Sequence, residues 1–231
     1  MLDMFETSAY FGFVITIVFF FLASYLKNKF KVLLLNPLLI TTILVVAFLL
    51  IFHIDYDTYN NGAKYISFFL TPTTVCLAVP LYKQVKILKQ NFIGIISGIL
   101  AGVISNGLVI ILLGSLLKLD KIINSSLLAK SITAPIAISL TDELGGISSI
   151  TVFAVILSGI TGAVIAPYIF KLFHIKNATA QGLALGTSAH GSGTTTALEL
   201  GEEQGAMSGL AIIVTGIITT VIVPIVSKLF L

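Results

Sequence analysis

The segment IINSSLLAKSITAPIAISLTDEL, residues 122–144, decides how this chain folds. It is apolar enough to enter a bilayer, yet Lys130 stands near its middle and Pro135 follows five residues later. Proline lacks a backbone N–H and is accepted in the first turn of a helix. The segment therefore predicts a helical hairpin with Thr133 or Ala134 at its tip and a second helix that begins there.

A second segment, residues 178–204, has the same mixed character. It contains the run Thr187-Ser188-Ala189-His190-Gly191-Ser192-Gly193-Thr194-Thr195-Thr196, followed by a helical pattern through Glu199. Its glycines permit tight turns, and its hydroxyl and peptide N–H groups can surround an anion. A phosphate loop is not predicted, because no strand pattern precedes the glycines and no Gly-Lys-Ser follows them.

The composition places the chain in the membrane. Of its 231 residues 57% are hydrophobic and only 10% are charged, whereas a soluble domain has about 25% charged residues. All 13 basic residues are lysines and the net charge is +3, which argues against a nucleic-acid-binding face. The single cysteine, Cys76, excludes an internal disulfide and a thiolate metal cluster, and we expect no cofactor.

Long apolar runs define the transmembrane helices, each of about 20 residues. Six runs are clear: 10–26, 32–52, 65–82, 92–117, 147–170 and 206–228. If 122–144 and 178–204 also crossed the bilayer, the loop lysines would divide six against six between its two sides.

If both segments instead return to the side from which they entered, the division becomes eight against four. The eight are Lys27, Lys29, Lys31, Lys83, Lys86, Lys89, Lys171 and Lys176, and the four are Lys64, Lys118, Lys121 and Lys228. Because lysines concentrate on the cytoplasmic side, we favour six spans, two re-entrant hairpins and both termini outside.

An internal repeat supports this topology. Residues 147–173 align with 204–230 without a gap, and ten of 27 positions are identical, including Gly159/Gly216 and Pro167/Pro224. Two Ile/Val-rich helices could also resemble each other by composition alone. Inverted repeats with broken helices are typical of secondary transporters. We expect one transmembrane domain, in which 1–121 form a scaffold with a broken third span and 122–173 and 178–231 are the two repeats.

Three breaks are candidate binding positions. In the first, Thr71, Thr73 and Thr74 surround Pro72 inside the third predicted span, where they form either a polar break or a simple kink. The second and third are the two hairpin tips, whose helix N-termini favour anions. Their candidate ligand residues are Lys130, Ser131, Thr133, Pro135, Ser188, His190, Gly191, Gly193, Thr194 and Glu199.

Lys130 and His190 each allow more than one role. Lys130 either binds an anion at membrane depth or extends to the headgroups. His190 either binds a carboxylate, carries a proton or hydrogen-bonds its loop. Ser188, His190 and Glu199 do not form a recognisable nucleophile motif, so no enzymatic activity is expected.

At this point the chain resembles the LrgB/CidB family of bacterial membrane proteins over nearly all of its length. The specific part is Lys130-Ser131-Ile132-Thr133-Ala134-Pro135-Ile136-Ala137, which is similar to the family's K-S-x-T-x-P-I-A stretch. The run from Ser188 to Glu199 is similar to its S-H-x-x-G-T-x-x-A-L-E stretch, with one extra Ala between Ser188 and His190.

The resemblance implies two functions. One is antiholin-like or holin-like modulation of murein hydrolase activity and autolysis, with a smaller LrgA/CidA-type membrane partner. The other is transport of small carboxylates, pyruvate in bacteria and glycolate or glycerate in a plastid relative. From the residues we expect a carboxylate carrier with elevator-like alternating access. The resemblance implies that it lies in the bacterial cytoplasmic membrane, and together with glycines on the fourth predicted span it suggests a homodimer.

Overall fold

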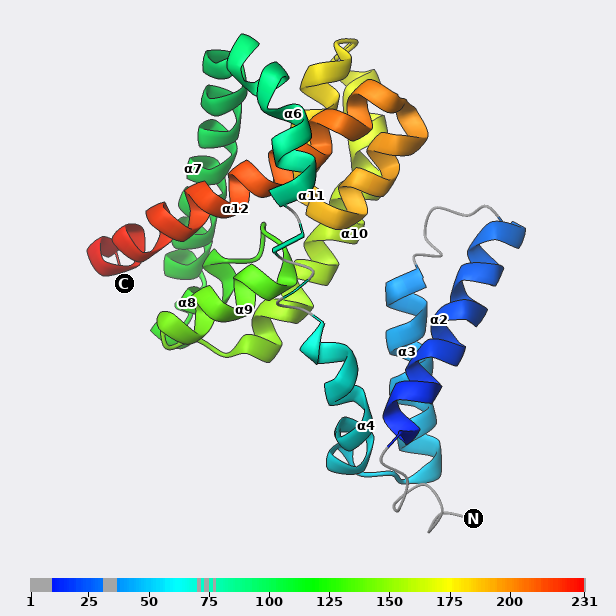
Figure 1. Cartoon of the computed structure of the whole chain (residues 1–231). Coiled ribbons are helices and arrows are strands. Elements are labelled where there is room, and N and C mark those ends of the chain that lie inside the picture. Colours follow the sequence, from blue (N-terminus) through cyan, green and yellow to red (C-terminus); the bar gives the residue numbers. More distant parts are fainter. Residues whose placement is uncertain (1–9, 31–36, 70–71, 73–74, 77, 231) are drawn as a thin grey trace. The chain divides into compact units, whose positions relative to one another are not determined.

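The computed structural model describes residues 10–30, 37–69, 72, 75–76 and 78–230, and every regular element in these ranges is a helix. The expected all-α fold is therefore confirmed for the described part of the chain. Contacts divide the chain after Thr73 into two units, which we describe separately. Figure 1 shows the helices in sequence colours.

Unit 1 contains α2 (Phe11–Phe30), α3 (Pro37–Phe52) and α4 (Tyr56–Phe68). Helices α2 and α4 cross at two glycines, because a Cβ on Gly12 would collide with the Tyr59 carbonyl and one on Gly62 would lie 2.7 Å from the Gly12 nitrogen. The Tyr59 hydroxyl also lies 2.9 Å from the hydroxyl of Thr16. Small residues at such crossings let helix backbones approach closely.

Unit 2 contains seven helices among its described residues. They are α6 (Ala78–Gln90), α7 (Phe92–Leu116), α8 (Lys121–Leu128), α9 (Ala134–Glu143), α10 (Ser148–Leu172), α11 (Ala178–Leu200) and α12 (Glu202–Phe230). Buried side chains of α7 such as Ile99 pack against Leu210 and Val214 of α12. A second core joins Ile110 of α7 to Leu128 and to neighbouring buried residues.

The long apolar helices agree with a multi-pass membrane protein. Among the described residues, α2, α7, α10 and α12 are long and apolar enough to span a bilayer, and α3 is a shorter apolar helix. The third predicted span, 65–82, coincides with no single described helix, because α4 ends at Phe68 and α6 begins at Ala78. Thr71, Thr73 and Thr74 lie outside the described residues.

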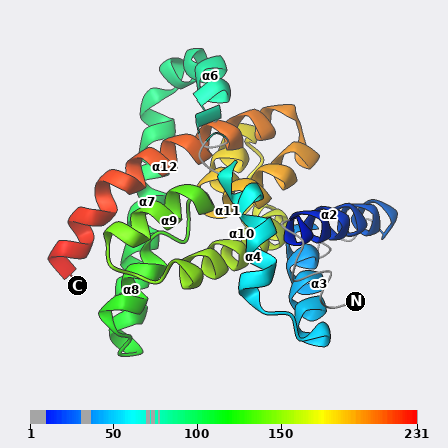
Figure 2. The ribbon, with the colours of Figure 1, turned by 60° about the horizontal axis from the view of Figure 1, so that its bottom comes forward.

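Helices α8 and α9 form the first hairpin, which lies beside α10 (Figure 2). Both of its legs bind α10 through one threonine. The hydroxyl of Thr151 donates to the Ser126 carbonyl on α8 at 2.8 Å and lies 2.8 Å from the hydroxyl of Thr141 on α9. The N-terminal end of α8 packs on the C-terminal end of α7, where Gly114 leaves room for the side chain of Asn124.

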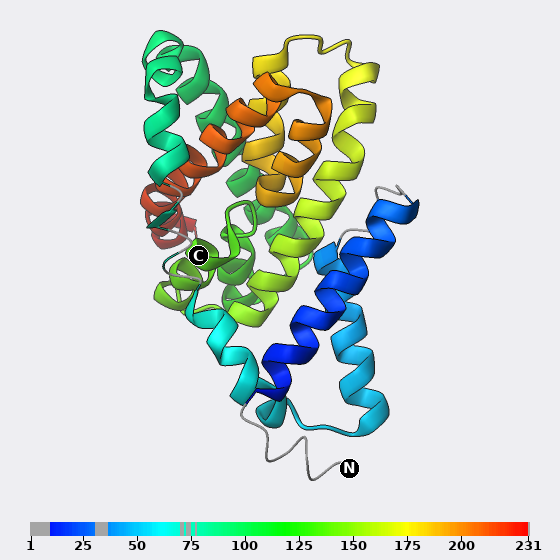
Figure 3. The ribbon, with the colours of Figure 1, turned by 45° about the vertical axis from the view of Figure 1, so that its right-hand side comes forward.

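Helix α11 folds back on itself at His190, where φ is 37° and ψ is −121°. A Cβ on Gly193 would collide with the carbonyl oxygen of Leu185, although residues eight apart in a straight helix are separated by about 12 Å. The two halves of α11 therefore lie side by side as a second hairpin (Figure 3). Thr179, near its first end, donates to Glu203 just beyond its second end.

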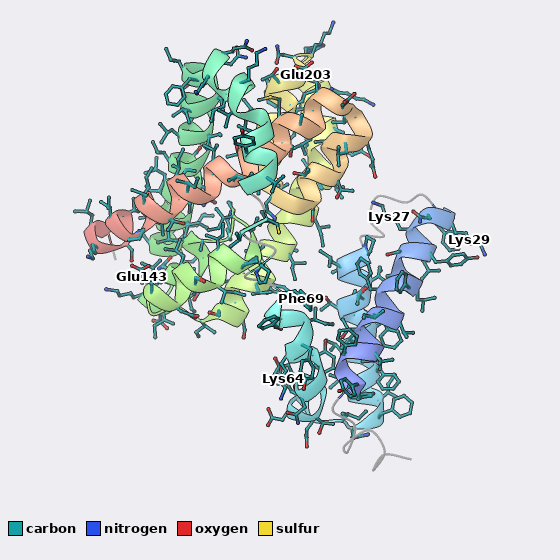
Figure 4. All side chains as sticks on the ribbon, in the orientation of Figure 1. Lys27, Lys29, Lys64, Phe69, Glu143 and Glu203 are labelled. Carbon is teal, nitrogen blue, oxygen red and sulfur yellow. The ribbon has the colours of Figure 1, made fainter. Side chains whose placement is uncertain are left out.

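The two hairpins enter unit 2 from opposite ends. Glu143 ends the first hairpin at one end of the unit, and Glu203 follows the second hairpin at the other end (Figure 4). The tips consequently point toward the middle of the helices between them.

Candidate functional site

The tip of the first hairpin is held by an asparagine in the middle of α7. The Lys130 ammonium donates to Oδ1 of Asn106 at 2.6 Å, and the Ser131 hydroxyl donates to the same oxygen at 3.0 Å. Lys130 Nζ also lies 3.2 Å from the Ser131 oxygen. Asn106 thus presents one neutral oxygen to two donors.

Lys130 is a half-buried cation whose only close partners are neutral. No carboxylate contacts it among the described residues. An unpaired buried charge costs several kcal/mol, so the tip carries positive potential that an anion would relieve. Helix α9 adds to this potential, because its N-terminal N–H groups begin at Ala134.

Thr133 is the N-cap residue of α9, but its side chain leaves the helix N-terminus uncapped. Its backbone is extended, φ −64° and ψ 142°, and its side chain caps no backbone N–H. The Thr133 hydroxyl oxygen is buried and has no hydrogen-bond partner. Pro135 lies in the first turn of α9, as predicted, where its missing N–H leaves no gap in the helix. A buried polar atom without a partner costs about 1–3 kcal/mol and calls for an explanation such as a ligand.

His190, at the tip of the second hairpin, also carries a buried polar atom without a hydrogen-bond partner. Its side chain is only 6% exposed, and its Nε2 has no hydrogen-bond partner. A non-glycine residue at positive φ is strained, and such strain concentrates at functional positions. The second half of α11 begins directly after His190, so the N-terminus of this half-helix lies at the tip.

Two consecutive residues of α10 bring the tips together. The Ser158 hydroxyl donates to the Lys130 carbonyl at 3.0 Å, which fixes the first tip. A Cβ on the next residue, Gly159, would lie 2.7 Å from Cε1 of His190, so this glycine makes room for the second tip. These contacts lie near the middle of α10, as Asn106 lies near the middle of α7.

The other predicted residues have different positions. Ser188 is exposed and donates to the Ala184 carbonyl within its own helix. Thr194 binds Ser208 of α12 at 2.7 Å, so it holds the hairpin to its neighbour. Gly193 permits the close approach of the two legs, whereas the Cβ position of Gly191 faces open space. Glu199 is exposed at the end of α11 remote from His190.

The structure thus brings Lys130 and His190 to neighbouring residues of α10, and Ser131 and Thr133 belong to the same hairpin tip as Lys130. Asn106 and Ser158 belong to the same cluster but were missed by the sequence reasoning. The polar character of Asn106 within the apolar segment 92–117 was the one available signal. In the described part of the chain, no three His, Cys, Asp or Glu side chains converge on a possible metal position.

Comparison with known proteins supports the resemblance. The model of the LrgB-like family matches residues 16–229. The antiholin-like protein LrgB of Bacillus subtilis is 38% identical over 219 residues, covering 94% of this chain and 95% of that protein.

Its counterparts in Bacillus cereus and Bacillus anthracis are 36% identical over 216 residues, covering 93% of this chain and 94% of each relative. No solved structure matches the chain significantly. A match over most of its length, with relatives of nearly equal length, means that the chain belongs to the LrgB-like family.

Proposed function

We propose that this protein is a membrane carrier of small monocarboxylate anions such as pyruvate or glycolate. One observation carries the proposal: the half-buried Lys130 has only neutral partners. The hydroxyl of Thr133 in the same hairpin tip and the Nε2 of His190 in the second tip are buried and unpartnered. A carboxylate would accept hydrogen bonds from the ammonium and the hydroxyl. It would also lie near the N-terminus of α9.

The proposed topology has six spans and two re-entrant hairpins, which form an inverted repeat. Residues 57 positions apart make equivalent contacts, which supports this proposal. Ser158 binds the first hairpin at Lys130, and Thr215 donates to Thr187 of the second at 3.4 Å. Gly159 accommodates His190 of the second hairpin, whereas Gly216 faces Ile136 of the first, 3.0 Å from its Cβ position.

Thr151 and Ser208 form another such pair. Thr151 bridges the legs of the first hairpin through Ser126 and Thr141. Ser208 binds Thr194 on the second leg of α11, and its backbone packs against Gly186 on the first leg. Matching contacts at three pairs of positions are not expected from shared composition alone.

The small number of donors favours a weakly bound, small substrate. The sequence has no arginine to form a bidentate clamp on a carboxylate. One ammonium, one hydroxyl and helix N-termini suffice for a monocarboxylate that must also be released. In this proposal the hairpins move against a dimeric scaffold, in an elevator-like alternation of access, in the bacterial cytoplasmic membrane. No catalytic step and no cofactor are required.

The names of the curated relatives favour a second function, that of an antiholin-like protein. In this alternative the protein oligomerises and modulates murein hydrolase activity together with an LrgA/CidA-type partner. The two functions differ in what they require of the hairpin tips, because an oligomer that acts through its lipid-facing surfaces has no need of buried unpartnered polar atoms.

Uptake of labelled pyruvate and glycolate into proteoliposomes of the purified protein tests the carrier proposal. We expect saturable uptake that unlabelled carboxylates inhibit and neutral solutes of similar size do not. The proposal fails if uptake stays at background with and without a partner protein while the vesicles become permeable to unrelated solutes. That result would favour the antiholin-like function.

A further inference from the structure

A groove at the end of α10 combines basic and apolar walls, and the proposed carrier site does not use it. It has a volume of about 470 Å³ and lies where α10 ends and the chain turns into α11. Pro167 and Phe170 contribute apolar wall, while Lys171, His174 and Lys176 contribute basic side chains. All three basic residues are exposed, and none of them forms an ion pair with a carboxylate in the described part of the chain.

The connection that carries these residues is held in a defined shape. His174 has a φ of 54°, and the N–H of Ile175 donates to the Phe170 carbonyl at 2.8 Å, which turns the chain sharply at the end of α10. The amide of Gln181 donates to the Ile175 carbonyl at 2.6 Å and ties the connection to α11. The basic side chains therefore surround a groove that exists before any ligand binds.

We propose that this groove binds the phosphate headgroup of an anionic phospholipid. The phosphate lies between Lys171 and Lys176, and the first part of an acyl chain lies against Pro167. Phe170, which is buried against Leu185 and Ala197, forms the inner wall of the groove. Helix α10 is long and apolar enough to span the bilayer, so its last turn lies at the depth of the headgroups. Basic pockets between helices at that depth are typical sites for anionic headgroups.

Two features favour a lipid over free phosphate. Lysines at an exposed position bind a small anion weakly and without geometric selectivity, since they lack the planar fork of arginine. The apolar wall offers nothing to inorganic phosphate but can bury hydrocarbon. The C-terminal end of α6 lies at the same end of unit 2 (Figure 1). Lys86 and Lys89 belong to this part of α6 and would add to the attraction of an anionic leaflet.

Native mass spectrometry of the full chain in detergent tests the proposal. The added ligands are dioleoyl phosphatidylglycerol, dioleoyl phosphatidylcholine and glycerol 3-phosphate. We expect retention of phosphatidylglycerol that falls as salt rises, with little retention of the other two. Removing one lysine with K171Q or K176Q should weaken phosphatidylglycerol binding about five-fold, and the double variant more strongly.

The double variant K118Q/K121Q is the matched control, because it removes two exposed lysines at the opposite end of unit 2. It should retain phosphatidylglycerol as the unmodified protein does. The proposal is overturned if phosphatidylcholine is retained equally, if glycerol 3-phosphate alone binds as well, or if the control loses as much lipid as K171Q/K176Q. The single variants and the salt series decide the question even if the double variant does not fold.

Discussion

Replacing Asn106 with aspartate would place a fixed carboxylate where the amide oxygen now accepts from Lys130 at 2.6 Å and Ser131 at 3.0 Å. The two side chains have nearly the same shape, so the packing stays almost unaltered. The substitution adds a charge and removes the long hydrogen bond from the Asn106 amide to the Leu128 carbonyl at 3.5 Å. The new carboxylate would pair with Lys130 and occupy the donors that we assign to the substrate. The introduced carboxylate therefore competes permanently with the substrate for Lys130.

The magnitude follows from the geometry of the pair. Two charges about 4 Å apart attract by about 4 kcal/mol at an effective dielectric constant of about 20. Desolvation of the buried carboxylate offsets part of this, which leaves a net coupling of about 2 kcal/mol, near the lower end of measured close pairs. A substrate that must displace this partner should bind about 30-fold more weakly, at 1.4 kcal/mol for each factor of ten.

The assay is the concentration dependence of labelled pyruvate uptake into proteoliposomes. Asn106→Asp should raise the apparent KM about 30-fold while the thermal stability of the purified protein stays equal or rises. Asn106→Leu, which has a similar volume and no charge, is the control. It removes the acceptor of Lys130 and Ser131 but adds no charge that competes with the substrate, so it should raise KM far less. An unchanged KM in Asn106→Asp, or an equal increase in Asn106→Leu, would refute the assignment of Lys130 as the anion contact.

Four further predictions concern the tips and the hairpins. Thr133→Val removes a buried hydroxyl without a partner, so uptake should fall about tenfold while the thermal midpoint is unchanged or higher; a lower midpoint would mean that the hydroxyl stabilises the fold. Gly193→Ala should destabilise the protein by about 1–3 kcal/mol in denaturant titrations because its Cβ meets the Leu185 carbonyl, whereas Gly191→Ala, facing open space, should be neutral or stabilising. Lys118→Gly should stabilise by up to about 1 kcal/mol, since Lys118 adopts a φ of 53° that favours glycine, and a lower unfolding midpoint would contradict this. In a Cys76→Ser background, cysteines introduced at exposed positions near Lys121 and Gly146 should react with an impermeant reagent from the same side of the membrane, and labelling from opposite sides would indicate that 122–144 crosses fully.

The hairpin tips were predictable because their signals are local. Pro135 removes a hydrogen bond wherever it lies, and the helix indeed begins again at Ala134. The run around His190 predicted a turn on account of its glycines, yet the residue that takes the positive φ is His190 itself, while Gly193 serves to let the two legs meet. Local conformation could thus be inferred, but the division of roles within the run could not.

The partners of the tips were not predictable in the same way. Asn106 and Lys130 are 24 residues apart, and Ser158 reaches Lys130 from 28 residues away. In a soluble helix the apolar stripe indicates which face is buried. In a membrane helix such as α7 the lipid-facing and protein-facing sides are both apolar. The hydrophobic pattern therefore says little about how the helix is rotated about its own axis.

By itself the sequence determined the membrane class, the approximate position of the long helices of unit 2 and the two interruptions at Pro135 and His190. Each of these depends on the composition or backbone chemistry of a short segment. The tertiary structure alone decided that Asn106 holds Lys130, that Ser158 and Gly159 bring two distant tips to the same place, and that Lys171 and Lys176 border an apolar groove. Such contacts depend on how helices are rotated and crossed, and that geometry follows from the packing of the whole unit.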